Sequence, residues 1–331
     1  MLEVSEIGTK EEVLTLFEKH RGVYFSGEDI AEKLAISRTA VWKAVKTLRS
    51  EGYHIDAVRN KGYSLSVETD ILSLQGIQKY LKPVCADMEI EVVPTVTSTN
   101  IIAREKAAVG KAEGYAVIAN TQTHGKGRKD RRFFSPSDTG IYMSILFRPT
   151  QCSAQEAVKL TTMAAVAVCE AIEAVSGVKA QIKWVNDIYV AGKKVCGILT
   201  EASFGLEDGN LEYAVVGIGI NVTPPKDDFP HELKDIAGTI FGRAQTDGKN
   251  HLAAEVLNQC MAHYAALKES KYIDNYRKRS LVIGKEISVI SSEGEKKAVA
   301  LDVDDDCRLI VKYESGITER LSSGEISVKL S

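Results

Sequence analysis

The fold of this chain is decided by one stretch: Gly125-Lys126-Gly127-Arg128-Lys129-Asp130-Arg131-Arg132-Phe133-Phe134-Ser135-Pro136. It lies between strands that we predict at 115–122 and 140–148, so it forms a loop that follows the first of them. Glycine lets the backbone approach a ligand closely, and clustered Arg and Lys side chains bind phosphate or carboxylate groups. The stretch therefore predicts an anion-binding loop whose two aromatic residues could stack on a base. The alternative is a basic loop that faces solvent.

A second region places charged side chains in apolar surroundings: Lys183-Trp184-Val185-Asn186-Asp187, then Lys193-Lys194-Val195-Cys196-Gly197-Ile198-Leu199. We predict strands at 180–184, 195–201 and 211–222. Burying a charge without a partner is costly, so Lys183 and Asp187 indicate a site, whereas Trp184 is equally well explained as core. Because the chain lacks a P-loop motif and a complete Gly-x-Gly-x-x-Gly fingerprint, a nucleotide would be bound by other means.

The N-terminal region has the pattern of a winged helix-turn-helix. Apolar residues between 9 and 20 form one helical stripe, and Ser26-Gly27-Glu28-Asp29 has capping-box spacing for a second helix. A tight turn at 35–37 leads to a helix at 38–50, which Ser37 would cap. Strands at 53–58 and 62–67 would form the wing. In this arrangement the later helix enters the DNA major groove.

Between residues 38 and 63, six basic residues stand against two acidic ones. This local excess favours DNA binding over the alternative, a small helical interaction module with a solvated face. The candidate DNA contacts are Arg38, Thr39, Trp42, Lys43, Lys46, Arg59 and Lys61.

Composition excludes several other classes of protein. The formal net charge of −3 argues against a general nucleic-acid coat, so a DNA site must be a local patch. The six cysteines show no Cys-x-x-Cys pair and the six histidines no His-Glu-x-x-His, which disfavours a disulfide framework or a protein-held transition metal. No apolar run approaches the roughly 20 residues of a membrane span. We expect a cytoplasmic protein that does not contact a membrane.

The chain resembles the biotin–protein ligases in four segments, which have the family's order and approximate spacing. They are Ser98-Thr99-Asn100, the stretch Gly125–Pro136, which we call the glycine-basic loop, the Lys183–Leu199 region, and Gly217-Ile218-Gly219-Ile220-Asn221. The resemblance runs from about residue 90 to the C-terminus. Four motifs in order are far more specific than any one of them. With the helix-turn-helix pattern in front, the chain resembles the bifunctional form, a biotin ligase that also represses the biotin operon.

The expected fold class is α+β in three domains. Residues 1–66 would form the winged helix-turn-helix, 67–280 a mixed α/β ligase domain, and 281–331 a small barrel, since short strands with turn signals begin near residue 283. The resemblance implies a class II aminoacyl-tRNA-synthetase-like ligase domain and an SH3-like barrel.

The resemblance implies a reaction in two steps. Biotin and ATP would give biotinyl-5'-AMP and pyrophosphate, and a lysine of a biotin carboxyl carrier domain would then take the biotin. Catalytic roles would fall to Arg128, Lys194 and Asp187. Biotin contacts would be Ser98, Thr99, Asn100, Gln122, Gly125, Lys126, Gly127, Arg128, Lys194 and Gly197. ATP contacts would be Arg131, Phe133, Asn186 and Asn221.

The protein alone is not expected to hold a metal, but Mg²⁺ would accompany ATP, with Asp187 as a possible neighbour. Asp187 could instead orient a basic side chain or act on the incoming lysine, and the sequence leaves these roles open. Three residues depart from the family's usual pattern: Val185 for proline, Lys126 for arginine and Asp130 for glycine.

Regulation would follow from ligand occupancy. Biotinyl-adenylate would order loops that form a homodimer face, and the dimer would present two winged helices to operator DNA. Two alternatives stay open: a lipoate-type acyl-adenylate ligase, and a transcription factor whose ligase-like domain senses a ligand without catalysis.

Overall fold

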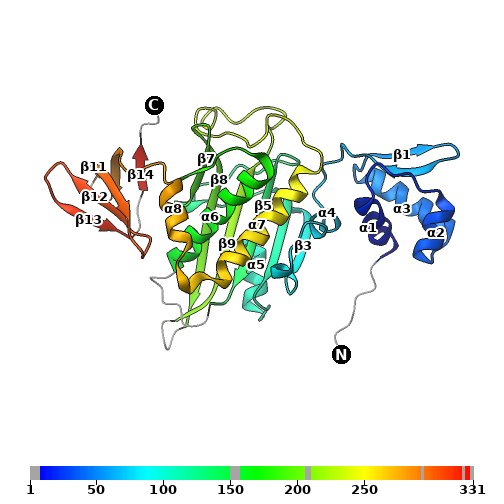
Figure 1. Cartoon of the computed structure of the whole chain (residues 1–331), viewed down its shortest axis with the longest axis horizontal. Helices are drawn as coiled ribbons and strands as arrows, with labels where there is room; N and C mark the ends of the chain where they lie inside the picture. Colours follow the sequence, from blue (N-terminus) through cyan, green and yellow to red (C-terminus); the bar gives the residue numbers. More distant parts are fainter. Residues whose placement is uncertain (1–7, 150–156, 206–209, 292–293, 323–324, 329–331) are drawn as a thin grey trace. The chain divides into compact units, whose positions relative to one another are not determined.

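The computed structural model describes residues 8–149, 157–205, 210–291, 294–322 and 325–328. The chain divides into two compact units (Figure 1). The small unit comprises Met1–Leu81 and Ala244–Ala254, and the large unit comprises Lys82–Arg243 and Glu255–Ser331. Within the described residues, no helix has both the length and the apolar character needed to cross a bilayer.

The small unit begins with the predicted winged helix-turn-helix. Its elements are α1 (Thr9–Lys19), α2 (Gly27–Leu34), α3 (Arg38–Ser50) and the antiparallel pair β1 (Ile55–Val58) and β2 (Gly62–Leu65). The predicted capping box forms, because Ser26 and Asp29 each accept a backbone hydrogen bond from the other. Fully buried apolar side chains from all three helices make the core: Val13, Phe17, Ile30, Val41 and Leu48.

The small unit also contains a group of two buried acids and two partly buried bases, which we call the closed charge cluster: Glu18, Asp247, Arg21 and Lys79. Arg21 Nη2 lies 2.7 Å from Glu18 Oε1 and 2.8 Å from Asp247 Oδ1, and Lys79 Nζ lies 2.7 Å from Glu18 Oε2. Glu18 and Asp247 are each 3% exposed. Burial opposes the charge on Arg21, but the hydrogen bond and charge of Glu18 and the charge of Asp247 outweigh it, and the pKa of Arg21 is raised.

Two helices lie beside this cluster. Helix α4 (Leu74–Gln78) was not predicted, because the sequence shows no strong pattern at 66–75, whereas α7 (Gly248–Ala265), which begins just after Asp247, agrees with a helix expected at 249–270. Asn250 is fully buried and joins them, since its Oδ1 accepts from Ser73 N at 2.9 Å and its Nδ2 donates to Ile71 O at 2.8 Å.

A mixed seven-stranded sheet forms the large unit, in the order β3-β4-β5-β9-β8-β7-β6. Strands β3 and β4 are parallel and the other neighbouring pairs are antiparallel. The strands are β3 (Glu89–Val96), β4 (Tyr115–Gln122), β5 (Gly140–Phe147), β6 (Gln181–Lys183), β7 (Asp187–Val190), β8 (Lys193–Phe204) and β9 (Leu211–Asn221). All were predicted except β7, a four-residue strand that directly follows a motif.

Helices cover this sheet. Helix α5 (Thr99–Ala108) packs on β4, β5 and β9, and α6 (Ala157–Ser176) packs on β8 and β9 and against α8 (Tyr272–Arg279) (Figure 1). The described part of α6 is buried on several faces, as predicted. Helix α8 was not predicted, because its short sequence is dominated by polar side chains.

The C-terminal part of the large unit is an antiparallel five-stranded sheet in the order β13-β12-β11-β10-β14. Its strands are β10 (Glu286–Ser291), β11 (Gly294–Val303), β12 (Leu309–Tyr313), β13 (Thr318–Leu321) and β14 (Glu325–Val328). Strand β13 was missed, since its sequence carries two charges in four residues.

Candidate active site

The large unit contains a cavity of about 420 Å³ at the ends of β4, β8 and β9. Predicted ligand and catalytic residues from four separate segments line it: Ser98, Thr99, Asn100, Gln122, Lys126, Gly127, Arg128, Arg131, Phe133, Asn186, Asp187, Lys194, Gly197 and Asn221. Gly125 does not. A Cβ at Gly125 would lie 2.5 Å from Phe133 O, so glycine is needed there for the close packing of the loop on itself.

The glycine-basic loop folds into a tight hairpin. Gly127 N donates to Arg131 O at 2.7 Å, and Phe133 N donates to Gly125 O at 2.9 Å. Between these bonds Asp130 has a φ of 59°, in the left-handed region that Asp adopts more readily than most side chains. The departure from glycine at this position is therefore compatible with the turn.

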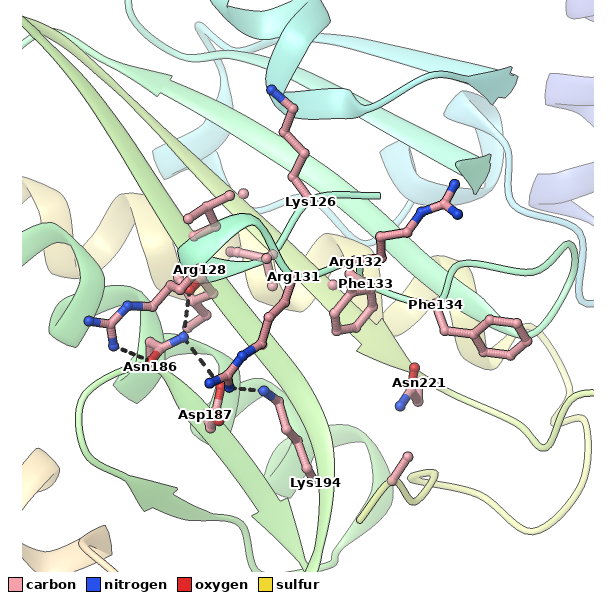
Figure 2. A pocket seen from close by; sticks show the side chains of 18 of the residues that line it. Lys126, Arg128, Arg131, Arg132, Phe133, Phe134, Asn186, Asp187, Lys194 and Asn221 are labelled. Carbon is pink, nitrogen blue, oxygen red and sulfur yellow. Dashed lines mark hydrogen bonds and ion pairs between the residues drawn. The ribbon is translucent and has the colours of Figure 1, made fainter. Parts of the chain in front are cut away.

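A wall of cations forms one side of the cavity (Figure 2). Arg128 Nη1 donates to Asn186 Oδ1 at 2.9 Å, and Lys194 Nζ lies 2.6 Å from Asp187 Oδ1. Asn186 is held in turn by its Nδ2, which donates to Ile198 O at 2.9 Å. Figure 2 shows the Arg131 side chain directed toward Asp187, whereas Lys126 extends away from this group.

The charge of the cavity is strongly unbalanced. Among the described residues that line it, seven are basic and one is acidic: Lys126, Arg128, Lys129, Arg131, Arg132, Lys183 and Lys194 against Asp187. Such an excess in a partly enclosed space creates a positive potential, which favours a bound polyanion. The predicted anion-binding loop is thus supplemented by lysines from β6 and β8.

The opposite end of the cavity is neutral and polar. Ser98, Thr99 and Asn100 are each less than 5% exposed. Gln122 Oε1 accepts from Thr99 N at 2.9 Å, and Ser144 Oγ donates to Asn100 Oδ1 at 2.7 Å. Ser98 stands at the N-cap of α5, where the sequence indicates the start of a helix, but its side chain makes no capping hydrogen bond.

Between these two ends of the cavity, the Phe133 ring lies over glycines of the sheet. Gly197 on β8 and Gly219 on β9 are directly paired across the strands. A Cβ at Gly219 would lie 2.5 Å from the Phe133 ring, and one at Gly197 would lie 3.4 Å from it. Gly219 thus lets Phe133 lie close to the sheet, whereas a Cβ at Gly197 would make only an ordinary contact with the ring.

Sequence reasoning missed several lining residues. The segment 224–243, of which 224–233 was predicted to be a ligand-gated loop, contributes Phe229, Leu233, Ile236 and Ala237, and β14 contributes Ile326. The backbone of this segment binds Lys194 on both sides: Lys194 N donates to Ile236 O at 2.8 Å and Gly238 N donates to Lys194 O at 2.9 Å. Proline and aspartate residues mark 224–233 as a candidate ligand-gated loop in the sequence, but the proximity of Ile236, Ala237 and Ile326 to the cavity arises from tertiary structure.

A buried thiol lies next to the cavity wall without being suited to chemistry. Cys196 on β8 is fully buried, and burial raises the pKa of its thiol well above the ordinary value. A thiolate nucleophile at this position is therefore disfavoured. In the part of the chain that the structure describes, no three His, Cys, Asp or Glu side chains are grouped to hold a metal ion.

The small unit exposes a second candidate site on α3 and the wing. All seven predicted DNA contacts are exposed, and Lys46 Nζ lies 5.2 Å from the centre of the Trp42 ring, which is 52% exposed. Arg49 differs from them, because its guanidinium donates to Ile55 O and so fastens the wing to α3. A basic helix face with an exposed aromatic ring suits contact with a nucleic acid.

Comparison with known families and proteins covers almost the whole chain. Residues 92–221 match the biotin/lipoate A/B protein ligase family, residues 9–64 match an HTH domain, and residues 282–329 match the biotin protein ligase C terminal domain. The bifunctional ligase/repressor BirA of Bacillus spizizenii is 35% identical over 96% of this chain and 98% of its own length. BirA of Escherichia coli is 27% identical over 93% of this chain and 94% of its own length.

A solved structure is similar to most of this chain. The biotin protein ligase from Aquifex aeolicus, in complex with biotin and ATP, is 26% identical and superposes with a TM-score of 0.61. The match covers 73% of this chain and 99% of that protein. Given this similarity along the full length, the chain belongs to the family of bifunctional biotin ligase/repressors.

Proposed function

We propose that this chain is an ATP-dependent biotin–protein ligase that also acts as a biotin-responsive transcriptional repressor. The observation that carries this proposal is that Arg128 and Lys194 line one cavity, whose other end is neutral and polar. A ligand with a neutral head and an anionic tail, joined to a nucleotide phosphate, would complement both ends.

The first step would bring two anions together. Biotin carboxylate would attack the α-phosphate of ATP, forming biotinyl-adenylate and releasing pyrophosphate. Arg128 and the backbone N–H groups of Lys126 and Gly127 would hold the carboxylate, and Lys194 would bridge it to the phosphate. Fixed cations in a site that excludes water stabilise the charge that develops in such a transition state.

The biotin head would bind at the neutral end. Its ureido ring both donates and accepts hydrogen bonds, which matches the hydroxyls of Ser98 and Thr99 and the amide of Gln122. Asn100 is already hydrogen-bonded to Ser144 and, through its Nδ2, to Glu201 Oε2 at 2.8 Å. We therefore assign Asn100 the role of shaping this end, while Gly197 and the Gly125 turn keep it open.

The nucleotide would occupy the space between Phe133 and the cations. The Phe133 ring would stack on adenine, with Asn186 and Asn221 near the nucleotide and Arg131 on its phosphates. Mg²⁺ would enter with ATP, held chiefly by phosphate oxygens, because Asp187 is the single carboxylate among the described lining residues. When bound, it would neutralise phosphate charge.

In the second step the carrier lysine amine would attack the acyl carbonyl, and AMP would leave. The 2.6 Å pair between Asp187 and Lys194 supports one of the three roles considered for Asp187, the positioning of a basic side chain. Asp187 would fix the Lys194 ammonium for the first step.

Repression would use the exposed face of α3 together with the wing. We propose that the adenylate-loaded protein dimerises, so that two small units meet a two-fold operator, and that a carrier protein relieves repression by consuming the adenylate. The family membership supports three domains at 1–66, 67–280 and 281–331, a class II synthetase-like ligase fold, and an SH3-like barrel formed by the C-terminal sheet.

A lipoate ligase is the nearest alternative, since the matched family includes lipoate ligases by name. The polar end of the cavity favours a urea over the apolar dithiolane ring of lipoate. Isothermal titration would separate the two: we expect tighter binding of biotin, and tighter binding of lipoate would overturn the choice.

The decisive experiment is to incubate the protein with ATP, Mg²⁺, labelled biotin and a biotin carboxyl carrier domain. We expect labelled carrier, and biotin-dependent exchange of pyrophosphate into ATP without the carrier. Biotin binding with neither reaction would instead favour a sensor that does not catalyse.

A further inference from the structure

Two hydrogen bonds hold the Trp184–Val185 segment, which directly precedes the cavity residues Asn186 and Asp187. The Trp184 indole Nε1 donates to Cys307 O at 3.1 Å, and the Tyr276 hydroxyl donates to Val185 O at 3.2 Å. Trp184 is 4% exposed and Tyr276 is 1% exposed, so water does not compete for these bonds. Tyr276 lies on α8 and is absent from the cavity lining, whereas Trp184 itself lines the cavity.

The turn that supplies the Cys307 carbonyl is itself rigidly built. It joins β11 to β12 in the C-terminal sheet, and Cys307 has a φ of 64°. Asp304 Oδ1 accepts from the backbone N–H of Asp306 at 3.0 Å and of Arg308 at 2.9 Å. Cys307 N donates to Asp304 O at 2.9 Å, which closes the turn. A carbonyl fixed in this way is a stable anchor.

The two supports are joined to each other. Arg277, next to Tyr276 on α8, donates through Nε to Val303 O at 2.6 Å and through Nη2 to Asp305 Oδ1 at 2.6 Å. Helix α8 and the turn at 303–308 therefore form one continuous platform behind the Trp184–Val185 backbone.

The platform affects the cavity through the two residues that follow Val185 in the sequence. Asn186 follows Val185 directly and accepts from Arg128, and Asp187 pairs with Lys194. A shift of the Trp184–Val185 backbone would move both contacts and hence both cations. Ser98, Thr99 and Gln122, at the neutral end, do not depend on this segment.

We propose that Tyr276 and Trp184 are positioning residues for the ligation reaction: through them the C-terminal sheet and α8 hold Asn186 and Asp187 so that Arg128 and Lys194 meet the reacting groups. This rests on the proposed function of the cavity. It makes the C-terminal region part of the adenylation machinery although its turn at 303–308 does not enter the cavity.

The test compares two hydroxyl deletions. Tyr276→Phe removes the bond to Val185. Tyr115→Phe removes the hydroxyl of another tyrosine that is 1% exposed as a whole, and this hydroxyl donates to Glu91 at 2.7 Å, away from the cavity. Trp184→Phe is the second positioning variant. Biotin-dependent pyrophosphate exchange is measured per active site, with active sites counted from the burst of biotinyl-adenylate.

We expect Tyr276→Phe and Trp184→Phe to lower kcat of exchange by about three- to tenfold, the scale of one net hydrogen bond. The KM for biotin should change less than about twofold, and Tyr115→Phe should keep the wild-type kcat while losing a similar amount of Tm. Because Tyr276→Phe keeps the ring, it tests the proposal even if Trp184→Phe does not fold.

Two results would overturn the proposal: an unchanged kcat per active site in Tyr276→Phe with a Tm loss like that of Tyr115→Phe, or a rise in the KM for biotin at constant kcat. Failure of the proposed function looks different, because the wild-type protein itself would then show no biotin-dependent exchange.

Discussion

The molecule contains two groups of clustered charge that differ in their balance. The closed charge cluster of the small unit has two acids and two bases, and Glu18 and Asp247 each bind both cations. The cavity of the large unit has seven bases and one acid among its described lining residues. The acids of the closed cluster are buried, where a charge is costly unless it is matched. Four of the seven cavity bases, Lys126, Lys129, Arg131 and Arg132, are instead exposed to solvent.

The difference separates structural from functional charge. In the closed cluster each charge has its counter-charge within the protein, so removal of one partner leaves the rest unmatched. In the cavity basic residues outnumber acidic ones among the described lining residues, which favours the binding of an anionic ligand. Mutations in the first group should therefore reduce stability, and mutations in the second should reduce activity.

The largest expected effect lies in the cavity. Arg128→Ala and Lys194→Ala should each lower the adenylation rate by roughly 10²–10³, the scale of losing one charged contact to a transition state. Their free energy of unfolding should fall by less than about 1 kcal/mol, because each variant relieves a cationic excess. Pyrophosphate exchange and denaturant unfolding measure the two quantities, and a rate loss under tenfold for both variants would contradict the assignment.

In the small unit we expect the opposite result, a loss of stability without a loss of activity. Asp247→Ala should destabilise this unit by about 3–5 kcal/mol, because the Arg21 and Lys79 charges stay buried with one acid in place of two. Hydrogen exchange in peptides from α1 and α4 measures the loss, and adenylation should stay within about twofold of wild type.

The control for that variant is Lys10→Ala in the same unit. Lys10 Nζ lies 2.8 Å from Glu51 Oε1, but both side chains are over 30% exposed, so the loss should stay below about 1 kcal/mol. Equal effects of Lys10→Ala and Asp247→Ala would remove the distinction between closed and solvated pairs.

A third, weaker effect concerns the exposed cations of α3. Arg38→Ala and Lys46→Ala should each weaken DNA binding by roughly three- to tenfold and flatten its salt dependence by about one phosphate contact, with ligation unchanged. The measurement is a binding titration against DNA selected from a random library by the adenylate-loaded protein. Lys297→Ala, an exposed lysine of the C-terminal sheet, is the control. An equal loss of ligation would contradict the separation of the two sites.

The smallest effect concerns Asp70, beside the closed cluster. Burial raises its pKa, although a hydrogen bond from Lys249 N at 2.8 Å and the charges of Lys249 and Arg21 oppose the rise, and Asp247 adds to it. Because the folded pKa lies above the unfolded one, the native state binds more protons, and this contribution to stability grows as the pH falls and is lost as it rises.

The variant Asp70→Asn should therefore be more stable than wild type at pH 7, and the difference should shrink toward pH 5. Unfolding curves at the two pH values measure it. If the difference in stability between the variant and the wild type does not depend on pH, the pKa of Asp70 is not raised in the folded protein.

The sequence predicted elements whose signals are local. Caps and apolar stripes indicated α1, α2 and α3, and most strands of both sheets followed from apolar runs between turns. The predicted site residues came from motifs, and the cavity gathers nearly all of them. The sequence could not show the closed cluster, since Glu18 and Asp247 look like ordinary surface charges until α1 and α7 are placed.

The short elements escaped prediction for a related reason. Strand β7 is paired on both sides within the large sheet, so its stability comes from its neighbours and not from its four residues. The same holds for the segment 224–243, whose contribution to the cavity depends on hydrogen bonds to Lys194 and not on its own composition.

Those two backbone hydrogen bonds connect the segment 236–238 to Lys194. Any movement of 236–238 away from β8 would break both bonds, although Lys194 would stay paired with Tyr189 of β7 and with Asp187. The backbone of Lys194 would therefore be held most firmly when this segment lies against β8, so the order of the segment and the precision of the lysine are coupled.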